Sequence, residues 1–266
     1  MMASAAAEFA TITRQIDTWG TLAWLDIKFR YRRTAIGPFW VTLSTGVTVL
    51  AVGLVYGQIF STPAGTSVTG YMAYFAVGTV VWGFISTVIN EACSVFSRSG
   101  PLIKALPTPL LTHVLRMMAR NIVLLAHNAV LIVLLWIVLR WPVGWNVVLV
   151  VPGMVLLTVA LLGAVVTLGI LGTRFRDLEP IVGALLQLMF LITPILWLPS
   201  AIRHTRASPL LDLNPGYYLL EIVRAPLLGE PFEIRTWIVA AVIATVSFIC
   251  GLFFYGRFRH RLAYWL

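Results

Sequence analysis

An uncharged, largely apolar run extends from Thr34 to Asn90 and reads TAIGPFWVTLSTGVTVLAVGLVYGQIFSTPAGTSVTGYMAYFAVGTVVWGFISTVIN. An apolar helix of roughly 20 residues crosses the hydrocarbon core of a bilayer, so this run is long enough for two crossings. Its centre, residues 61–70, reads STPAGTSVTG and is rich in turn-forming residues. We therefore expect two membrane spans here, at about residues 37–60 and 71–92.

Further apolar runs follow along the chain, and they predict spans at about residues 121–139, 146–172, 180–199 and 236–256. The chain of 266 residues is 59% hydrophobic and only 11% charged, whereas charged residues make up about a quarter of an ordinary soluble domain. The composition excludes such a domain. It predicts an all-α polytopic membrane protein with six transmembrane helices.

The distribution of Lys and Arg predicts the orientation. With six spans, the N-terminal segment, the loops after the second and fourth spans and the tail share one side, which holds 14 of the 19 Lys and Arg residues. Loops rich in positive charge stay in the cytoplasm, so we expect both termini there and the chain in the inner (cytoplasmic) membrane. The rule accounts for the net charge of +9 better than nucleic-acid binding does. We expect a cytoplasmic segment at 1–36, a six-span domain at 37–256 and a basic cytoplasmic tail at 257–266.

Sequence motifs for catalysis and cofactor binding are absent. A phosphate-binding P-loop needs Gly-Lys followed by Ser or Thr, but both lysines, Lys28 and Lys104, follow isoleucine. The four histidines stand at least 14 residues apart, which excludes a metal pair on adjacent helical turns. We therefore expect a chain that is not an enzyme and that binds no metal and no cofactor itself.

The segment before the first span carries several arginines. Its apolar and charged residues alternate from Leu25 to Arg32, a period that suits a strand as well as a helix. A lone strand at a membrane surface would leave its backbone unpaired, so we expect an amphipathic helix in the interface. The segment has two interpretations, a basic membrane anchor or a site for an anionic substrate headgroup. The candidate residues for the headgroup site are Arg30, Tyr31, Arg32 and Arg33.

The loop after the second span, residues 97–113, has prolines at both ends of a short apolar stretch. Pro101 can begin a helix at its first position, and Pro107 and Pro109 must end it. A rigid helical turn or two at the cytoplasmic surface is a natural docking element. The alternative is a turn that only connects two spans.

Four segments together resemble the permease subunit of type-two ABC exporters that move polysaccharides and polyol phosphates, the family of O-antigen, capsule and teichoic-acid permeases. They are Asp26–Trp40, Gly100–Pro109, the turn Phe175–Leu178 and Leu213–Tyr218. The resemblance runs from about Trp19 to the C-terminus, and the four segments occur in the family's order.

The resemblance implies a homodimer whose two copies form the channel, with two copies of a separate ATPase subunit that binds ATP and Mg. It implies that the chain moves a lipid-linked (polyprenyl pyrophosphate) glycan, that the N-terminal helix lies beside the cytoplasmic entrance, and that residues 200–235 form external re-entrant helices. It also implies contacts that couple the permease to the ATPase. These involve Gly100, Pro101, Leu102, Ile103, Lys104, Ala105, Leu106, Pro107, Thr108 and Pro109, with a smaller contact at Arg174, Arg176 and Asp177.

Aromatic residues offer a surface on which sugars can stack in a wet, uncharged conduit. The candidates for channel lining are Phe39, Trp40, Tyr56, Tyr71, Tyr74, Trp82, Tyr217 and Tyr218. The alternative for each is a place in the interfacial aromatic belt that membrane proteins commonly have. Glu91 is the one acid expected within or at the edge of a span, with either Arg98, seven residues later, as its partner or simple exposure at the interface.

Three other functions compete with glycan export. A drug or lipid exporter of the same type-two architecture would need the same ATPase but no lipid-linked glycan. A membrane transferase would need a pair of carboxylates for metal and phosphate, and Asp177 with Glu179 is a poor approximation of one. A secondary transporter would usually carry ionisable residues near mid-membrane or inverted repeats, and neither pattern is visible. We expect a glycan exporter.

Overall fold

The computed structural model describes residues 16–34, 36–37, 39–61, 67–105, 108–203, 205–206 and 208–266, and the regular structure within these ranges is entirely helical. Five helices are long and apolar enough to cross a membrane. They are α3 (Phe39–Ser61), α4 (Val68–Ala92), α7 (Leu110–Leu139), α8 (Val150–Arg174) and α12 (Ile234–Trp265). The prediction of an all-α architecture with multiple apolar spans is confirmed.

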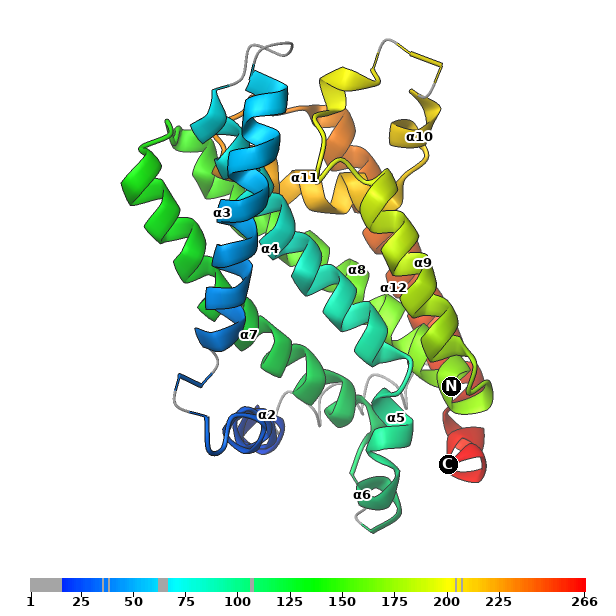
Figure 1. Ribbon diagram of the computed structural model, residues 1–266. Helices are drawn as coiled ribbons and strands as arrows, with labels where there is room; N and C mark the ends of the chain where they lie inside the picture. The colour runs from blue at the N-terminus through cyan, green and yellow to red at the C-terminus, as the bar shows by residue number, and fades with distance from the viewer. Residues whose placement is uncertain are drawn as a thin grey trace.

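The predicted span at residues 180–199 is only partly helical. Helix α9 (Leu178–Ile192) has 15 residues, which at about 1.5 Å per residue gives roughly 22 Å, less than the hydrocarbon core of about 30 Å. It ends because Thr193 precedes Pro194 and takes an extended conformation. A sixth span is therefore not confirmed, although α9 runs between the two ends of the molecule (Figure 1).

Shorter helices gather at the two ends of the molecule (Figure 1). Helices α2 (Ile16–Arg30), α5 (Val95–Arg98) and α6 (Gly100–Ala105) lie at one end, together with the C-terminus. We call this the α6 end. Helices α10 (Pro209–Asp212) and α11 (Pro215–Leu227) lie at the opposite end, called here the α11 end. The 3₁₀ segments η1 (Trp145–Leu149) and η2 (Pro199–Ala201) complete the described elements.

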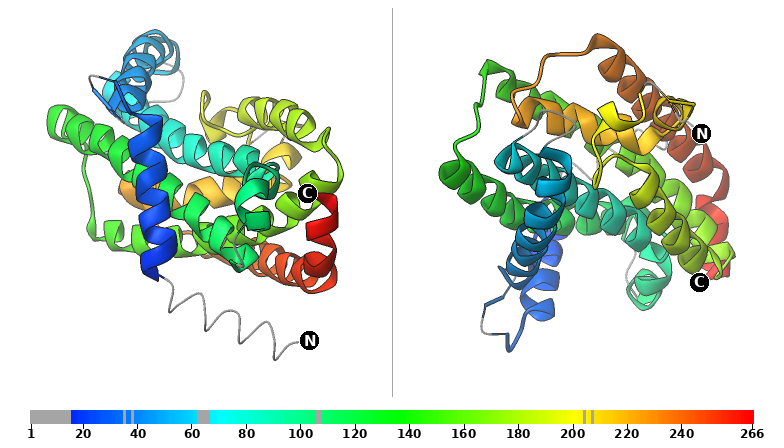
Figure 2. Two further views of the ribbon diagram at one scale, coloured as in Figure 1. Left: turned by 90° about the horizontal axis from the view of Figure 1, so that it is seen from below. Right: turned by 45° about the horizontal axis from the view of Figure 1, so that its top comes forward.

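Helix α2 lies across the molecule. Figure 1 shows it nearly end-on beneath the long helices, and Figure 2 shows the same helix from below along its length. Its side chains Ala23 and Ile27 are buried, while Trp24 and Phe29 are exposed. A helix with this placement and with both apolar and charged surface fits the predicted interface helix, whose depth in a bilayer stays a prediction.

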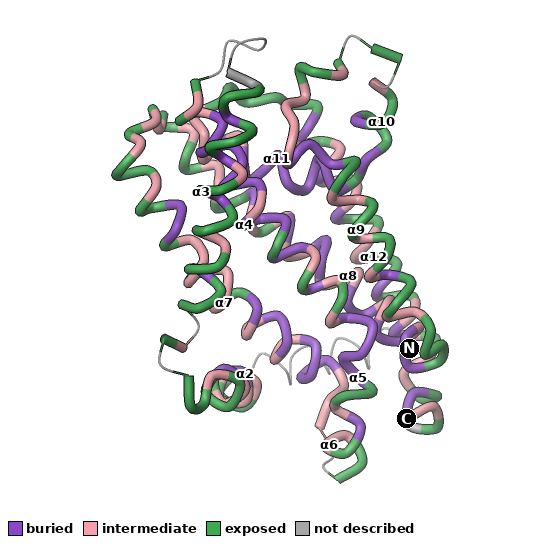
Figure 3. Tube along the Cα trace, viewed as in Figure 1, coloured by how far each residue is buried: buried purple, intermediate pink, exposed green. Residues whose placement is uncertain are grey.

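Helix α4 forms the centre of the bundle. It is buried along most of its length, unlike α3, α9 and much of α12 (Figure 3). Its large side chains Tyr71, Phe75 and Ile85 are at most 2% exposed. Helices α3, α7, α8 and α9 each pack against it. The many apolar side chains exposed on α3 are suited to contact with lipid or with another copy of the chain.

Helices α8 and α12 approach each other closely. A Cβ atom at Gly163 would lie 2.2 Å from the carbonyl oxygen of Ser247, and one at Gly251 would lie 2.8 Å from the carbonyl oxygen of Gly163. The Ser247 hydroxyl donates a hydrogen bond of 2.7 Å to the Ala160 carbonyl. Small residues at such crossings are typical of membrane helices because dispersion contacts and hydrogen bonds drive their association.

Two helices are longer than the apolar runs predicted. Helix α7 begins at Leu110 rather than near residue 121, and α12 continues through the predicted tail to Trp265. Arg116 and Arg120 interrupt the apolar run but remain helical, because acids from other helices neutralise them. In α12 the side chain of Leu262 is fully buried, so the basic segment after residue 256 packs on the fold.

Candidate functional site

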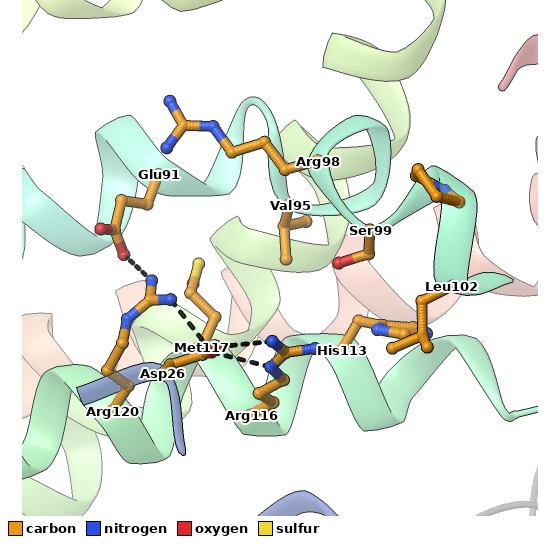
Figure 4. A pocket seen from close by; sticks show the side chains of 11 residues that line it. Asp26, Glu91, Val95, Arg98, Ser99, Leu102, His113, Arg116, Met117 and Arg120 are labelled. Carbon is orange, nitrogen blue, oxygen red and sulfur yellow. Dashed lines mark hydrogen bonds and ion pairs between the residues drawn. The ribbon is translucent and has the colours of Figure 1, made fainter. Parts of the chain in front are cut away.

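A cavity of about 380 Å³ lies at the α6 end, between α2, α4, α6 and α7 (Figure 4). Charged side chains from three of these elements and from α5 meet at it, whereas a packed membrane core is apolar. We call it the α6-end cavity. It is lined by Asp26, Glu91, Val95, Arg98, Ser99, Pro101, Leu102, His113, Arg116, Met117 and Arg120.

Asp26 joins α2 to α7. Arg116 donates two hydrogen bonds to its carboxylate, and the Nε to Oδ2 distance is 2.7 Å. Arg120, one turn further along α7, approaches Oδ2 at 3.4 Å. The paired geometry of guanidinium and carboxylate gives direction as well as charge neutralisation. This arrangement therefore fixes which face of α2 contacts the long helices.

Glu91 is the second carboxylate of this cluster, and its partners differ from the predicted one. Its Oε2 accepts hydrogen bonds from Arg120 at 2.5 Å and from the Asn121 amide at 2.7 Å, and its Oε1 accepts one from Arg30 at 3.1 Å. Arg98 instead pairs with Glu179 at 2.8 Å. The expected Glu91–Arg98 pair is wrong because α4 ends at Ala92, so the two residues do not share one helical face.

The cluster of Asp26, Glu91, Arg30, Arg116 and Arg120 connects three helices. We call it the carboxylate–arginine cluster. Its acids are largely shielded, with side chains 18% and 14% exposed for Asp26 and Glu91. Removing one member of a buried ion pair leaves an uncompensated charge, which is strongly destabilising. The cluster therefore holds α2 against the ends of α4 and α7.

The predicted headgroup residues occupy two environments. Arg30 binds Glu91, and its side chain is 41% exposed. Arg32 and Arg33 are exposed beyond the end of α2, and Tyr31 is half-buried. Arg33 has a φ of 69°, in the left-handed region. Arg32 and Arg33 remain candidates for an anionic headgroup, and the role of all four residues stays a prediction.

The predicted coupling segment forms the short helix α6 at the α6 end (Figure 1). Pro101, Lys104 and Ala105 are exposed, and Leu102 and Ile103 are half-buried. Gly100 is buried near the C-terminal Leu266. Leu106 and Pro107 lie outside the described residues. The hydroxyl of Thr108 lies 3.3 Å from Nε2 of His113, and Pro109 directly precedes α7.

The predicted second contact, the turn between α8 and α9, lies at the same end. Arg174, Arg176 and Asp177 are exposed there. The Arg174 guanidinium lies 5.7 Å from the ring centre of Trp265, near the end of α12. The turn and α6 are thus two separate exposed elements that one partner could contact, and their role in coupling stays a prediction.

A buried arginine at the α11 end was missed by the sequence analysis. Arg224 is fully buried, donates a hydrogen bond of 2.6 Å to the Pro194 carbonyl, and donates two to Glu221. Its guanidinium lies 4.1 Å from the ring centre of Tyr74. The only signal in the sequence was an acid and a base three residues apart in a helix, which exposed helices also show.

A second cavity, of about 520 Å³, lies beside this pair at the α11 end. Its polar lining includes Arg203, Tyr217, Glu221, Glu230 and Glu233. Burial raises the pKa of Tyr217 to about 12, and the charge of Glu221 adds to the effect. Burial and the same neighbour also raise the pKa of Glu230.

The predicted channel-lining aromatics divide into two groups. Tyr71, Tyr74, Trp82, Tyr217 and Tyr218 are buried inside the single chain. The hydroxyls of Tyr71 and Tyr74 donate to the carbonyls of Leu196 and Pro194, both at 2.6 Å. Phe39, Trp40 and Tyr56 on α3 are exposed, although Phe39 makes an edge contact with His127 at 5.2 Å. The α3 group is exposed in the single chain, and which of the eight residues line a channel stays a prediction.

Groups of three or more His, Cys, Asp or Glu side chains suited to a metal ion do not occur among the described residues. Both cysteines are unpaired, Cys93 buried and Cys250 exposed. Burial, with a smaller contribution from Glu179, raises the pKa of the Cys93 thiol to about 11.

Comparison with known proteins places these features in a family. The model of the ABC-2 type transporter family matches residues 18–228. The O-antigen export system permease protein RfbA of Myxococcus xanthus is 30% identical over 207 residues, covering 75% of this chain and 76% of the relative. The protein of the same name from Klebsiella pneumoniae is 22% identical over 244 residues, covering 90% of each chain. The matched region contains the carboxylate–arginine cluster, α6 and the turn between α8 and α9.

Proposed function

The chain belongs to the ABC-2 type transporter family, and we propose that it is the permease subunit of an ATP-driven exporter that moves a lipid-linked polysaccharide, such as O-antigen, across the inner membrane. The observation that carries this proposal is the similarity to O-antigen permeases over most of the chain. The earlier resemblance to this family rested on the segments at 26–40, 100–109, 175–178 and 213–218. Three of these segments lie at the α6 end.

The proposed partner is a separate ATPase subunit that binds ATP and Mg and that docks at the α6 end. Support comes from the two exposed elements there, α6 and the turn at residues 174–177. Helix α6 is short, and Pro101 restricts the backbone of its first turn. Movement of α6 would pass directly to α5 and to α7, which flank it in the chain.

In the proposed complex, two copies of the chain form the channel and two ATPases lie below them. The exposed apolar surface of α3 supports a contact with lipid or with the second copy. Phe39, Trp40 and Tyr56 would then be available to the polymer, while Arg32 and Arg33 would face the carrier's pyrophosphate near the entrance. The cytoplasmic position of both termini, a sixth crossing through α9 and re-entrant α10 and α11 belong to the same proposal.

The export proposal is tested by depleting the protein and measuring polyprenyl-linked lipids by mass spectrometry. We expect carrier-linked polymer to accumulate and the surface polymer to disappear, and the mass of the glycan identifies the substrate. Unchanged carrier lipids with an intact surface glycan would contradict polysaccharide export. That outcome would favour export of a drug or another lipid-like small molecule by the same architecture.

Charge reversal at Lys104 tests the coupling proposal. We expect Lys104→Glu to reduce export and stimulated ATP hydrolysis by about tenfold or more, since an interface charge of the wrong sign costs binding to the ATPase. Arg140→Glu is the matched control, because Arg140 is also exposed but lies at the far end of α7. Both variants should insert at wild-type levels. Equal activity of the two would contradict docking through α6.

A further inference from the structure

Two residues that line the α6-end cavity have buried polar atoms without hydrogen-bond partners. His113 is 2% exposed, yet its Nδ1 has no hydrogen-bond partner among the described residues. Nε of Arg120 is likewise buried without a partner within the described ranges. Buried donors and acceptors are nearly always satisfied, and those left open point to a missing water or ligand. Both residues line the same cavity.

The neighbouring ion pairs orient these groups. Arg116 uses Nε and Nη2 to bind Asp26, and Arg120 uses Nη2 to bind Glu91. A guanidinium has five N–H donors, so the acids hold the arginines in place and leave donors for a further acceptor. His113, Arg116 and Arg120 follow one another at three and four residues along α7, which places them on one helical face.

The charge of the lining favours an anion. Arg98, Arg116 and Arg120 line the cavity against Asp26 and Glu91, which leaves a formal charge of +1. Arg98 forms an ion pair with Glu179 through Nη2, and both side chains of this pair are exposed to solvent. Arginine is suited to phosphate because its planar donors match the oxygens and because it stays charged under all physiological conditions.

The walls of the cavity fit a headgroup at the membrane surface. Val95, Leu102 and Met117 provide apolar contacts, and the volume of about 380 Å³ exceeds that of a phosphate group. Pro101 and Leu102 belong to α6, and Asp26 belongs to the surface helix α2. A ligand here would contact the interface helix and the docking segment at once.

We propose that the α6-end cavity is a binding site for the phosphate-bearing headgroup of a membrane lipid, with Arg116 and Arg120 as the donors. This inference rests on the proposed export function only where it names the exported carrier lipid as one of two possible ligands. Two lipids carry such a headgroup: the exported carrier, with its diphosphate, and an anionic phospholipid. Arg32 and Arg33 do not line this cavity.

Native mass spectrometry of the purified full-length chain in detergent tests the site. The probes are undecaprenyl diphosphate, phosphatidylglycerol and, as a zwitterionic control, phosphatidylcholine. Arg120→Gln should weaken binding of the anionic lipids about tenfold or more, as expected for loss of a charge-assisted hydrogen bond. Ser99→Phe should do the same by filling the cavity, and it removes no charge. Arg261→Gln is the matched control, because this arginine is exposed near the end of α12, at the same end but outside the cavity.

The outcomes separate the alternatives. Loss of binding in Arg120→Gln and Ser99→Phe but not in Arg261→Gln supports the site. Selectivity for undecaprenyl diphosphate over phosphatidylglycerol identifies the exported carrier as the source. Equal binding of both anionic lipids identifies a structural phospholipid. Unchanged binding in Ser99→Phe, with the protein monodisperse, would overturn the proposal and leave water in the cavity. Because the assay needs neither ATPase nor export, its result is independent of the depletion experiment.

Discussion

Two arginines that form the same type of ion pair can contribute very differently to the stability of the fold. Arg224 and Arg235 each pair with an acid, Glu221 and Asp212. The Arg224 side chain has no exposed surface, whereas that of Arg235 is 64% exposed. Solvent screens the second pair but not the first, so only the first is expected to matter for stability.

We expect Arg224→Ala to destabilise the protein by about 3–5 kcal/mol, because it leaves the Glu221 carboxylate and the Pro194 carbonyl without their buried donor. Arg235→Ala should cost about 0–1 kcal/mol. Thermal unfolding of the purified proteins in one detergent measures the difference. Similar midpoints for the two variants would contradict the structural role of Arg224.

The Cys93 thiol should react slowly in the folded protein. Its pKa of about 11 lies above the ordinary value, so at pH 8 the reactive thiolate is about a hundredfold scarcer than in the unfolded chain. The rate of maleimide labelling should rise with pH toward 11. The measurement uses Cys250→Ala, in which Cys93 is the remaining cysteine. Rapid labelling at pH 8 without detergent denaturation would contradict a buried thiol.

Residue patterns in the sequence predicted the apolar spans but not the partners of the charges. Asp26 and Arg116 are 90 residues apart, and only the packing of α2 on α7 brings them together. Arg116 and Arg120 looked like the end of a span for the same reason, since their neutralising acids are distant in sequence. The Arg224 site was missed because its burial comes from α4, from Pro194 and from the rest of α11.

At the scale of helices, the crossing of α8 and α12 is a close contact between two backbones at glycine residues. The length and place of both helices could be predicted from their apolar runs, but their crossing point could not. The crossing point depends on which small residues face each other. Both helices contain several glycines, so the sequence does not single out the pair of Gly163 and Gly251. Helix α9 was overestimated because hydropathy continues past Ile192 whereas helical geometry does not.

Gly163→Ala should destabilise the protein by about 1–3 kcal/mol, because the new methyl group collides with the backbone at Ser247 and neither helix can yield locally. Gly83→Ala is the control: it also lies within a long helix, but a Cβ there meets nothing within 4 Å. It should be neutral or slightly stabilising, since alanine favours helix. Thermal unfolding in detergent compares the two, and a neutral Gly163→Ala would mean that the helices are further apart than described.

At the scale of the whole molecule, the arrangement of ends follows from the chain's path. The α6 end carries α2, α6 and the C-terminus; α9 leads from this end to the α11 end, and α12 brings the chain back (Figure 1). The count of six spans predicted both termini on one side, and the Lys and Arg distribution predicted that this side is cytoplasmic, which stays a prediction. Hydropathy does not determine which of the two ends faces the cytoplasm.

Reporter fusions should place the α6 end in the cytoplasm. A fusion at the C-terminus should be active with a cytoplasmic reporter and inactive with a periplasmic one, and a fusion at Gly144, between α7 and α8, should show the reverse. The expected contrast is about tenfold or more, because positively charged loops are retained. If both sites respond to the same reporter, the proposed orientation and the crossing by α9 are wrong.

The bond between Asp26 and Arg116 also has a consequence for biosynthesis. The two residues are separated by 90 positions, and ribosomes add about 5–20 residues per second. During roughly the first 5–20 s after Asp26 is made, its carboxylate has no arginine from α7 to bind. Helix α2 is therefore synthesised before its partner, and two apolar helices are inserted in between. It can reach its final position only after α7 has left the ribosome.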